Sequence, residues 1–188
     1  MDLNTLPEKI KTSCCDKCAK EKNIQQDEIY HDNACEICGE YIPKMFTRQN
    51  LKDQVFLNMA FELSKLGTCC RLKVGVILLR KDGSIASGGY NGSLPGMIHC
   101  NPDTCNSKQR CLHTSHGEEN ALFFSTGDIH TAYVTDETCL VCTRMLARRG
   151  VKRIVFEREY KSISDQEKEE RDQIISHHNI SWECIKRE

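Results

Sequence analysis

The sequence predicts an α/β sandwich around one mixed sheet of five strands, preceded by a small cysteine-rich module. Two observations lead to this prediction. After residue 44, stretches of helical periodicity alternate with short apolar stretches in the order α-β-β-α-β-α-β-α-β, which is typical of helices packed on a central sheet. Before residue 44, five of the 13 cysteines precede Tyr41-Ile42-Pro43, where the proline indicates a domain boundary. We therefore expect a module over residues 1–43 and a larger domain over residues 44–188.

The N-terminal module carries two cysteine pairs at the spacing of a zinc ribbon. Each pair has the form C-x2-C, and sixteen residues separate the two pairs. Such pairs are typical of a tetrahedral four-cysteine zinc site, and in so small a module the metal would supply the folding energy. The expected ligands are Cys15, Cys18, Cys35 and Cys38. A structural role is the default, while nucleic-acid contact, partner docking and an oligomer interface stay open.

The larger domain is expected to begin with an amphipathic helix over residues 48–66, which Gly67 ends. The residues predicted to form its buried face are Leu51, Val55, Met59 and Leu63. An apolar, β-branched stretch over 73–80 predicts a strand, and Asp82-Gly83 predicts a hairpin turn into a second strand over 84–89.

The other elements follow a long loop over residues 88–114. They are helices over 116–125, 139–149 and 165–177, and strands over 131–135, 152–157 and 180–185. The charge run over 165–172 predicts a solvated helix face. Cys184, between Trp182 and Ile185, is expected in the core.

Composition and charge exclude several classes of function. Lys and Arg number 26 against 27 Asp and Glu, so the net charge of −1 provides no field that attracts nucleic acid. No stretch approaches the ~18–20 apolar residues of a membrane span, and the start MDLNTLPEKIK is too polar for a signal peptide. We therefore expect a cytoplasmic protein with no membrane partner. In that compartment an odd count of cysteines indicates metal ligands rather than disulfides.

A further metal-binding pattern combines His116-Gly117-Glu118 with Cys139-x2-Cys142. A catalytic zinc takes three protein ligands and leaves one position for water, and His116, Cys139 and Cys142 at helix starts supply these three. The helix dipole there favours thiolate. Glu118 lies where a carboxylate reaches the zinc-bound water and moves its proton. Zinc lowers the pKa of that water towards ~7, so hydroxide is expected to attack an electron-poor ring carbon. H-x-E…P-C-x-x-C is the signature of zinc nucleobase deaminases.

Residues 69–160 resemble the deoxycytidylate (dCMP) deaminase branch of the zinc-dependent cytidine deaminase superfamily. The resemblance covers about half of the chain. Its matching pieces are Cys69-Cys70-Arg71-Leu72-Lys73-Val74-Gly75, Gly89-Tyr90-Asn91-Gly92-Ser93, His99-Cys100, His116-Gly117-Glu118-Glu119-Asn120-Ala121-Leu122, Ala132-Tyr133-Val134-Thr135, Cys139-x2-Cys142 and Gly150-Val151-Lys152-Arg153-Ile154-Val155-Phe156. The G-Y-N-G motif is the most specific piece, because it separates the nucleotide branch from tRNA, guanine and free-cytidine deaminases.

The resemblance implies a cytidine deaminase-like fold and hydrolytic deamination of dCMP to dUMP in pyrimidine deoxyribonucleotide metabolism. Zinc-bound hydroxide would attack C4, with Glu118 as the proton shuttle. The family also implies a homo-oligomer, commonly a hexamer, and allosteric switching by dCTP and dTTP. Carried over residue by residue, Asn91 would hold the sugar or phosphate and Tyr160 would stack on the pyrimidine. An ordinary strand-end aromatic is the alternative for Tyr160.

Three positions depart from the family pattern. Gly117 and Thr138 replace the alanine of H-A-E and the proline of P-C-x-x-C, which could widen the pocket and admit a 5-modified cytosine. Gly in place of Ala costs about 1 kcal/mol of helix propensity. Neither change removes a ligand or the proton shuttle. His113 replaces an arginine of many bacterial relatives, which leaves the phosphate contacts open.

A third cysteine group lies around the long loop, which at this length needs an anchor or has a function. Relatives use cysteines at similar places for a second, structural zinc. The expected ligands are Cys69, Cys100, Cys105 and Cys111, with His99 and His113 as competitors and free buried thiols as the alternative. In total we expect one catalytic and one or two structural Zn²⁺ ions. Two other functions stay open: a deaminase acting on cytosine in single-stranded DNA or RNA, and a non-catalytic zinc scaffold.

Overall fold

The computed structural model describes residues 12–13, 29–30, 48–103, 105, 111, 113–160 and 163–187. The chain divides into two compact units, residues 1–49 and 50–188. In the first unit, β1 (Thr12–Ser13) and β2 (Ile29–Tyr30) pair in parallel. The expected zinc-ribbon ligands Cys15, Cys18, Cys35 and Cys38 lie outside the described residues. The ribbon therefore stays a prediction.

From residue 48 onward the chain forms four helices and a five-stranded mixed sheet of order β4-β3-β7-β8-β9, as the sequence predicts. The elements are α2 (Arg48–Ser64), β3 (Gly75–Leu79), β4 (Ile85–Tyr90), β5 (Gly92–Ser93), β6 (Thr114–Ser115), α3 (Gly117–Phe124), β7 (Thr131–Asp136), α4 (Leu140–Arg148), β8 (Arg153–Arg158), α5 (Asp165–His177) and β9 (Ser181–Cys184). β3 pairs antiparallel with β4 and β7, while β7, β8 and β9 run parallel. The two-residue pair β5–β6, which joins the two ends of the long loop, was not predicted.

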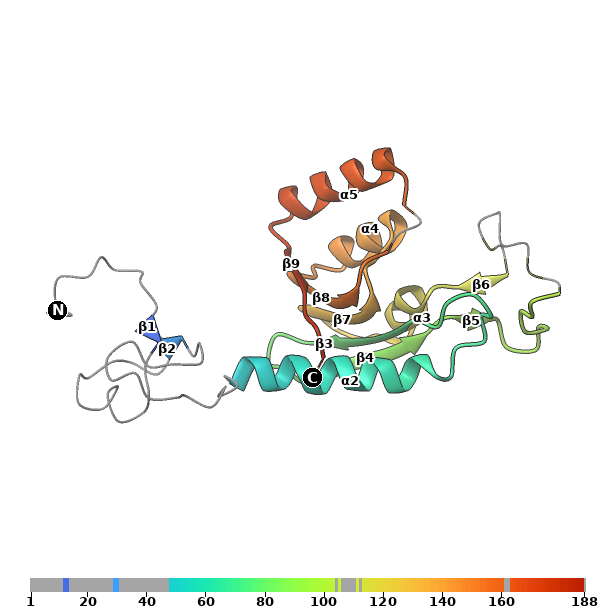
Figure 1. Cartoon of the computed structure of the whole chain (residues 1–188), viewed down its shortest axis with the longest axis horizontal. Coiled ribbons are helices and arrows are strands. Elements are labelled where there is room, and N and C mark those ends of the chain that lie inside the picture. The colour runs from blue at the N-terminus through green and yellow to red at the C-terminus, as the bar shows by residue number, and fades with distance from the viewer. Residues whose placement is uncertain are drawn as a thin grey trace, which may run out of the picture. The chain divides into compact units, whose positions relative to one another are not determined.

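Helices cover both faces of this sheet, with α2 on one face and α3, α4 and α5 on the other (Figure 1). Side chains of a strand point alternately to the two faces. Accordingly Val76 and Leu78 of β3 pack in the core cluster with α3 and α4, whereas Ile77 and Leu79 pack with α2. The predicted α/β sandwich is confirmed.

The buried face of α2 agrees only in part with the predicted one. Met59 and Leu63 are half-buried and pack against the core cluster as predicted, whereas Leu51 and Val55 are 57% and 46% exposed. The fully buried residues of the helix are Asp53, Leu57, Ala60 and Ser64. Asp53 faces inward because Arg153 and the hydroxyl of Tyr133 bind its carboxylate, a long-range ion pair that hydrophobic periodicity does not reveal.

Two glycines allow helices to lie directly on the sheet. A Cβ on Gly75 would overlap the carbonyl oxygen of Ala60 in α2, and a Cβ on Gly89 would lie 2.5 Å from backbone atoms of Gly117 and Ala121 in α3. Gly89 is the first residue of the G-Y-N-G motif, so part of that motif's pattern serves the close packing of α3 against β4.

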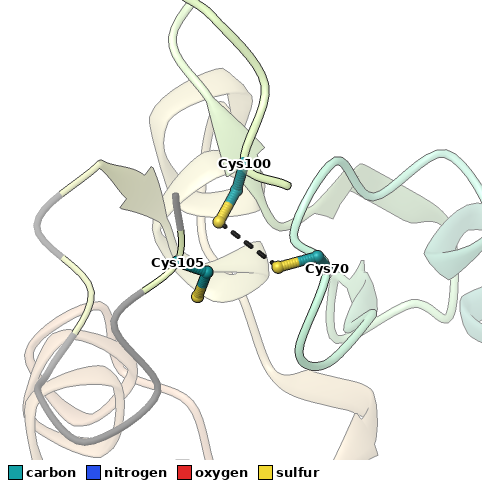
Figure 2. Close-up of side chains that lie close together, drawn as sticks. All are labelled: Cys70, Cys100 and Cys105. Atoms are coloured by element: carbon teal, nitrogen blue, oxygen red, sulfur yellow. Dashed lines mark hydrogen bonds between the residues drawn. The ribbon is translucent and has the colours of Figure 1, made fainter. Parts of the chain in front are cut away.

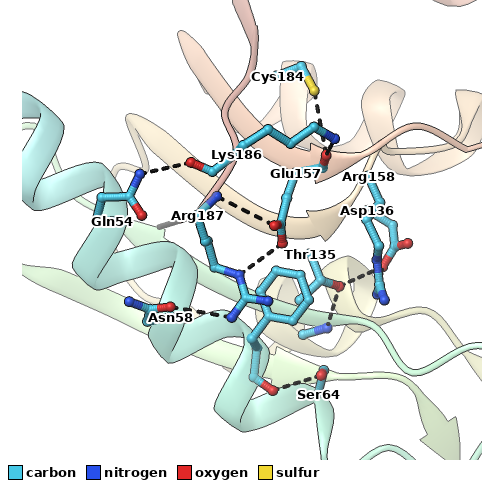
Figure 3. A network of polar contacts seen from close by, with 12 residues as sticks. Gln54, Asn58, Ser64, Thr135, Asp136, Glu157, Arg158, Cys184, Lys186 and Arg187 are labelled. Atoms are coloured by element: carbon cyan, nitrogen blue, oxygen red, sulfur yellow. Dashed lines mark hydrogen bonds and ion pairs between the residues drawn. The ribbon is translucent and has the colours of Figure 1, made fainter.

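The last described residues fasten α2 to β8 (Figure 3). The Gln54 side chain donates to the Lys186 carbonyl (2.9 Å), and Arg187 forms an ion pair with Glu157 (2.8 Å). The Arg187 guanidinium lies 3.3 Å from the ring centre of Phe61. These contacts join the first helix of the unit to the end of the chain.

One local prediction on β9 is wrong and one on α5 has a single exception. Cys184, expected in the core, is exposed at the end of the edge strand β9. The charge run over 165–172 is exposed as predicted except at Arg171, which is only 2% exposed. Arg171 is buried because a carboxylate of the β7–α4 loop and the ring of Trp182 lie against it.

Candidate active site

Three expected zinc ligands converge between two helix starts. His116 is the N-cap of α3, Cys139 is the N-cap of α4, and Cys142 lies one turn further along α4. His116 Nδ1 lies 3.6 Å from Cys139 Sγ and 3.3 Å from Cys142 Sγ. The three ligand atoms lie within 4.8 Å of one another.

These distances fit a zinc ion. Bonds of about 2.3 Å to sulfur and about 2.05 Å to nitrogen at tetrahedral angles separate the two atoms by about 3.6 Å. Two thiolates and one imidazole are also the donor set of a catalytic zinc with one remaining position. In the protein without metal, the hydrogen bond from Cys142 lowers the pKa of Cys139 to about 4 and raises that of Cys142. One of the two sulfurs is thus readily a thiolate.

Glu118 lies in the first turn of α3, two residues after the histidine ligand. Its side chain is 4% exposed, and burial raises the pKa of its carboxyl to about 7. Glu118 lines the same cavity as His116 and Cys139. A carboxyl group with a pKa near neutrality is suited to both accepting and donating a proton.

The cavity next to these residues has a volume of about 690 Å³, which is the size of a small-molecule site. Both expected substrate-binding residues, Asn91 and Tyr160, line it. The Asn91 side chain accepts from the backbone N–H of Val74 (2.8 Å) and donates to the Leu72 carbonyl (2.7 Å). Asn91 therefore holds the loop before β3 in place as one wall of the cavity.

The two departures from the H-A-E and P-C-x-x-C patterns have local structural counterparts. A Cβ on Gly117 would lie 3.2 Å from both the Val74 carbonyl oxygen and a methyl of Val76, so little room exists there. Thr138 is fully buried, and its hydroxyl lies 2.7 Å from that of Thr143, which donates to the Cys139 carbonyl (3.0 Å). Two hydroxyls thus order the turn at the position where the P-C-x-x-C pattern has a proline.

The long loop brings together a different set of sulfurs from the expected one. Cys70, Cys100 and Cys105 have their sulfurs within 4.8 Å of one another, and Cys70 Sγ and Cys100 Sγ are 3.5 Å apart (Figure 2). Two expected ligands, Cys100 and Cys105, are in this cluster, together with Cys70, which was not among the expected ligands. Cys69 is buried outside it, and Cys111 Sγ lies 2.7 Å from the Thr114 hydroxyl. His99 and His113 are exposed and outside the cluster.

Several cavity residues had not been predicted. Arg71 is the one Lys or Arg side chain among the described lining residues. The carboxylates beside Glu118 in this lining are Asp136, Glu137, Glu159 and Glu167. Asp136 forms an ion pair with Arg158 at 2.6 Å (Figure 3). Asp136 and Glu137 directly precede Thr138 and Cys139 in the sequence. Their nearness to the C-x2-C pair was the sequence signal that could have identified them as cavity residues.

Among the described residues, no helix is both long and apolar enough to cross a membrane.

Comparisons with known proteins point to one family. Residues 50–158 match the family model described as the cytidine and deoxycytidylate deaminase zinc-binding region. ComE operon protein 2 of Bacillus subtilis (strain 168) is 33% identical over 116 residues, which are 58% of this chain and 61% of that protein. The deoxycytidylate deaminase of Mycobacterium phage D29 is 30% identical over 123 residues, which are 57% of this chain and 94% of the phage protein.

A solved structure agrees with these sequence relatives. The apo dCMP deaminase of cyanophage S-TIM5 is similar at a TM-score of 0.57 and 25% identity, over 74% of this chain and 100% of that one. The chain therefore spans nearly all of the phage proteins but less than two thirds of the Bacillus protein.

Proposed function

The chain belongs to the cytidine and deoxycytidylate deaminase family, a class of zinc-dependent deaminases, and from this premise we propose that it hydrolyses dCMP to dUMP and ammonia. The observation that carries the proposal is the convergence of His116, Cys139 and Cys142, with His116, Cys139 and the buried Glu118 lining one cavity. The proposal is supported by the names of the relatives. The cyanophage S-TIM5 enzyme, 24% identical, has also been solved in complex with dCMP and dUMP.

The residues of the chain have distinct roles in this reaction. His116, Cys139 and Cys142 would hold zinc, which when bound supplies the Lewis acidity that activates water near neutral pH. Glu118 takes a proton from the water, whose oxygen bonds to C4, and delivers that proton to N3 of the cytosine ring. It then transfers the second proton, from the new C4 hydroxyl, to the amino group, so that the C4–N bond breaks, ammonia leaves and the oxygen stays as O4. Burial of Glu118 keeps bulk water from competing for these protons.

Charge in the cavity restricts where the phosphate of a nucleotide could bind. The described lining contains five carboxylates and, as Lys or Arg, only Arg71. A 5′-phosphate is repelled by the carboxylates, so we place it at Arg71, whose guanidinium can bind it through two hydrogen bonds. Asn91, in the same wall, is proposed for the sugar and Tyr160 for the face of the pyrimidine.

We also propose that Cys70, Cys100 and Cys105 hold a structural zinc that anchors the long loop, with the fourth ligand from Cys69 or Cys111. Its support is the gathering of three sulfurs, at a Cys70–Cys100 distance of 3.5 Å against about 3.8 Å for two thiolates on one tetrahedral zinc. Family membership is the ground for proposing a homo-oligomer, response to dCTP and dTTP, and a cytoplasmic location. We propose that the chain divides into an N-terminal module over residues 1–43 and a larger domain over residues 44–188.

One assay separates the candidate functions. The zinc-loaded full chain is incubated with dCMP, deoxycytidine, dCTP, cytidine or a cytosine-containing oligonucleotide, and ammonia release is followed. Turnover of dCMP with little turnover of the others is the expected result. Turnover of the oligonucleotide alone would replace the proposal by a polynucleotide deaminase. No turnover of any substrate, with dCTP present as an activator, would indicate a zinc scaffold.

The phosphate contact has its own test. Arg71→Gln should raise the KM for dCMP about tenfold or more, the effect of losing a charge-assisted bidentate contact, and leave the slow turnover of deoxycytidine unchanged. An equal effect on both substrates would contradict the placement of the phosphate at Arg71.

A further inference from the structure

Helix α5 has a single buried residue, and that residue is an arginine. Of its 13 residues only Arg171 is buried, with 2% of its surface exposed. Arginine is almost never buried without a partner, because removing a guanidinium from water is costly. The contacts of Arg171 therefore show what this helix is attached to.

Arg171 is directed at the loop that carries a zinc ligand. Its Nη2 forms an ion pair with Glu137 Oε1 at 2.9 Å, and its Nη1 donates to the Thr138 carbonyl at 3.4 Å. Its guanidinium also lies 4.9 Å from the ring centre of Trp182. Glu137 and Thr138 immediately precede Cys139.

Glu137 continues the connection to the cavity. Its second oxygen, Oε2, accepts a hydrogen bond from the backbone N–H of Tyr160 at 3.1 Å. Glu137, Tyr160, Ile163 and Glu167 all line the cavity, and Ile163 and Glu167 lie at the start of α5. One carboxylate thus joins Arg171, the tyrosine and the loop before Cys139.

Stability alone does not account for this arrangement. A buried ion pair is often no more stabilising than apolar side chains of similar size. The chain offers a comparison in Arg153, which forms ion pairs with Asp53 and Glu183 and lines no part of the cavity. The Arg171 pair differs because its ion pair to Glu137 and its hydrogen bond to Thr138 end on the segment before Cys139, of which Glu137 lines the cavity.

We propose that Arg171 and Glu137 are positioning residues, which hold the cavity wall formed by Tyr160, Ile163 and Glu167 against the Cys139 loop and thereby set the affinity for substrate. This inference rests on the proposed deaminase function. Since neither residue is assigned a proton transfer, their loss acts on the KM more than on the kcat.

The test compares Arg171→Met, Glu137→Gln and the double variant of the full zinc-loaded chain, with Arg153→Met as the control. Arg171→Met is expected to raise the KM for dCMP about tenfold or more, because displacement of a binding wall by about 1 Å has large effects. The kcat and the zinc content are expected to change less than the KM. Because Arg171 acts through Glu137, the double variant should have the KM of Glu137→Gln alone. The control should lower the unfolding midpoint without changing the KM.

Arg171→Lys and Glu137→Gln carry the test if Arg171→Met does not fold. The lysine variant keeps the positive charge but cannot make both the Nη1 and the Nη2 contacts of the guanidinium. Its KM for dCMP should therefore lie between those of the parent and Glu137→Gln. The inference is overturned if Arg171→Met lowers only the unfolding midpoint, as the control does, or if the effects of the two single variants on the KM multiply in the double variant. Absence of turnover in the parent chain would refute the proposed function instead.

Discussion

Exchange of Glu118 for glutamine tests the chemistry at the centre of the site. The substitution keeps the size of a side chain that is 4% exposed and removes its ability to exchange a proton. Hydrolysis of dCMP needs at least two proton transfers, one to the ring and one to the leaving amine. General acid–base catalysis contributes about 10²–10⁴-fold for a transfer.

The two carboxylates that directly precede the C-x2-C segment are bound elsewhere. Asp136 and Glu137 are engaged by Arg158 and Arg171, and Glu118 itself is buried. We therefore expect Glu118→Gln to lower the kcat by at least about 10⁴-fold. The KM should change little, because the residue moves protons and is not assigned to binding.

The assay follows ammonia release from dCMP by matched preparations of parent and variant, with zinc per chain and the thermal midpoint measured on the same samples. Zinc content should be equal, since Glu118 is not a ligand. The midpoint should not fall, because a neutral amide costs less to bury than a carboxylate. A kcat within tenfold of the parent at equal zinc content would refute the assignment of Glu118 as the proton shuttle.

Three further substitutions test the scaffold. Gly75→Ala should cost more than about 3 kcal/mol in urea unfolding, because its Cβ would overlap a carbonyl oxygen of α2; an unchanged midpoint would contradict this close packing. Arg153→Met should cost about 3–5 kcal/mol, because it leaves the buried Asp53 carboxylate uncompensated. Arg153 also lowers the pKa of Glu183 below its ordinary value of 4.5, so the stabilisation by this ion pair is complete above that pH and is lost as the pH falls below it. The parent-to-variant difference in urea midpoint should therefore shrink below a pH of about 4.5, and a constant difference would contradict this linkage. Cys70→Ser should remove one zinc per chain by metal analysis and leave dCMP turnover measurable, whereas unchanged zinc content would rule out Cys70 as a ligand.

The predictions that were based on local sequence patterns were the reliable ones. His116 and the Cys139–Cys142 pair could be found because their spacing and helix-start positions are encoded within a few residues. The order of strands and helices followed from alternation of apolar stretches. The helix over 165–177 was predicted with the bounds that the structure has.

Long-range pairing was the part that the sequence did not reveal. Asp53 is buried because of a partner 100 residues away, and the predicted face of α2 missed this residue while it included the exposed Leu51 and Val55. Arg171 was hidden in a run of charges because its carboxylate partner belongs to another loop. Adjacent Cys69 and Cys70 are alike in composition and spacing, and only the fold places Cys70 beside Cys100.

The attachment of the chain end to α2 has a consequence for biosynthesis. Gln54 and the Lys186 carbonyl that it binds are 132 residues apart, and ribosomes add about 5–20 residues per second. Gln54 of α2 is therefore synthesised about 7–26 s before its partner. During that interval the buried face of α2, including the Asp53 carboxylate, has no completed sheet against which to pack. The unit over residues 50–188 is thus expected to close only after residue 186 has been synthesised, with chaperone binding at α2 as the event to look for in nascent chains.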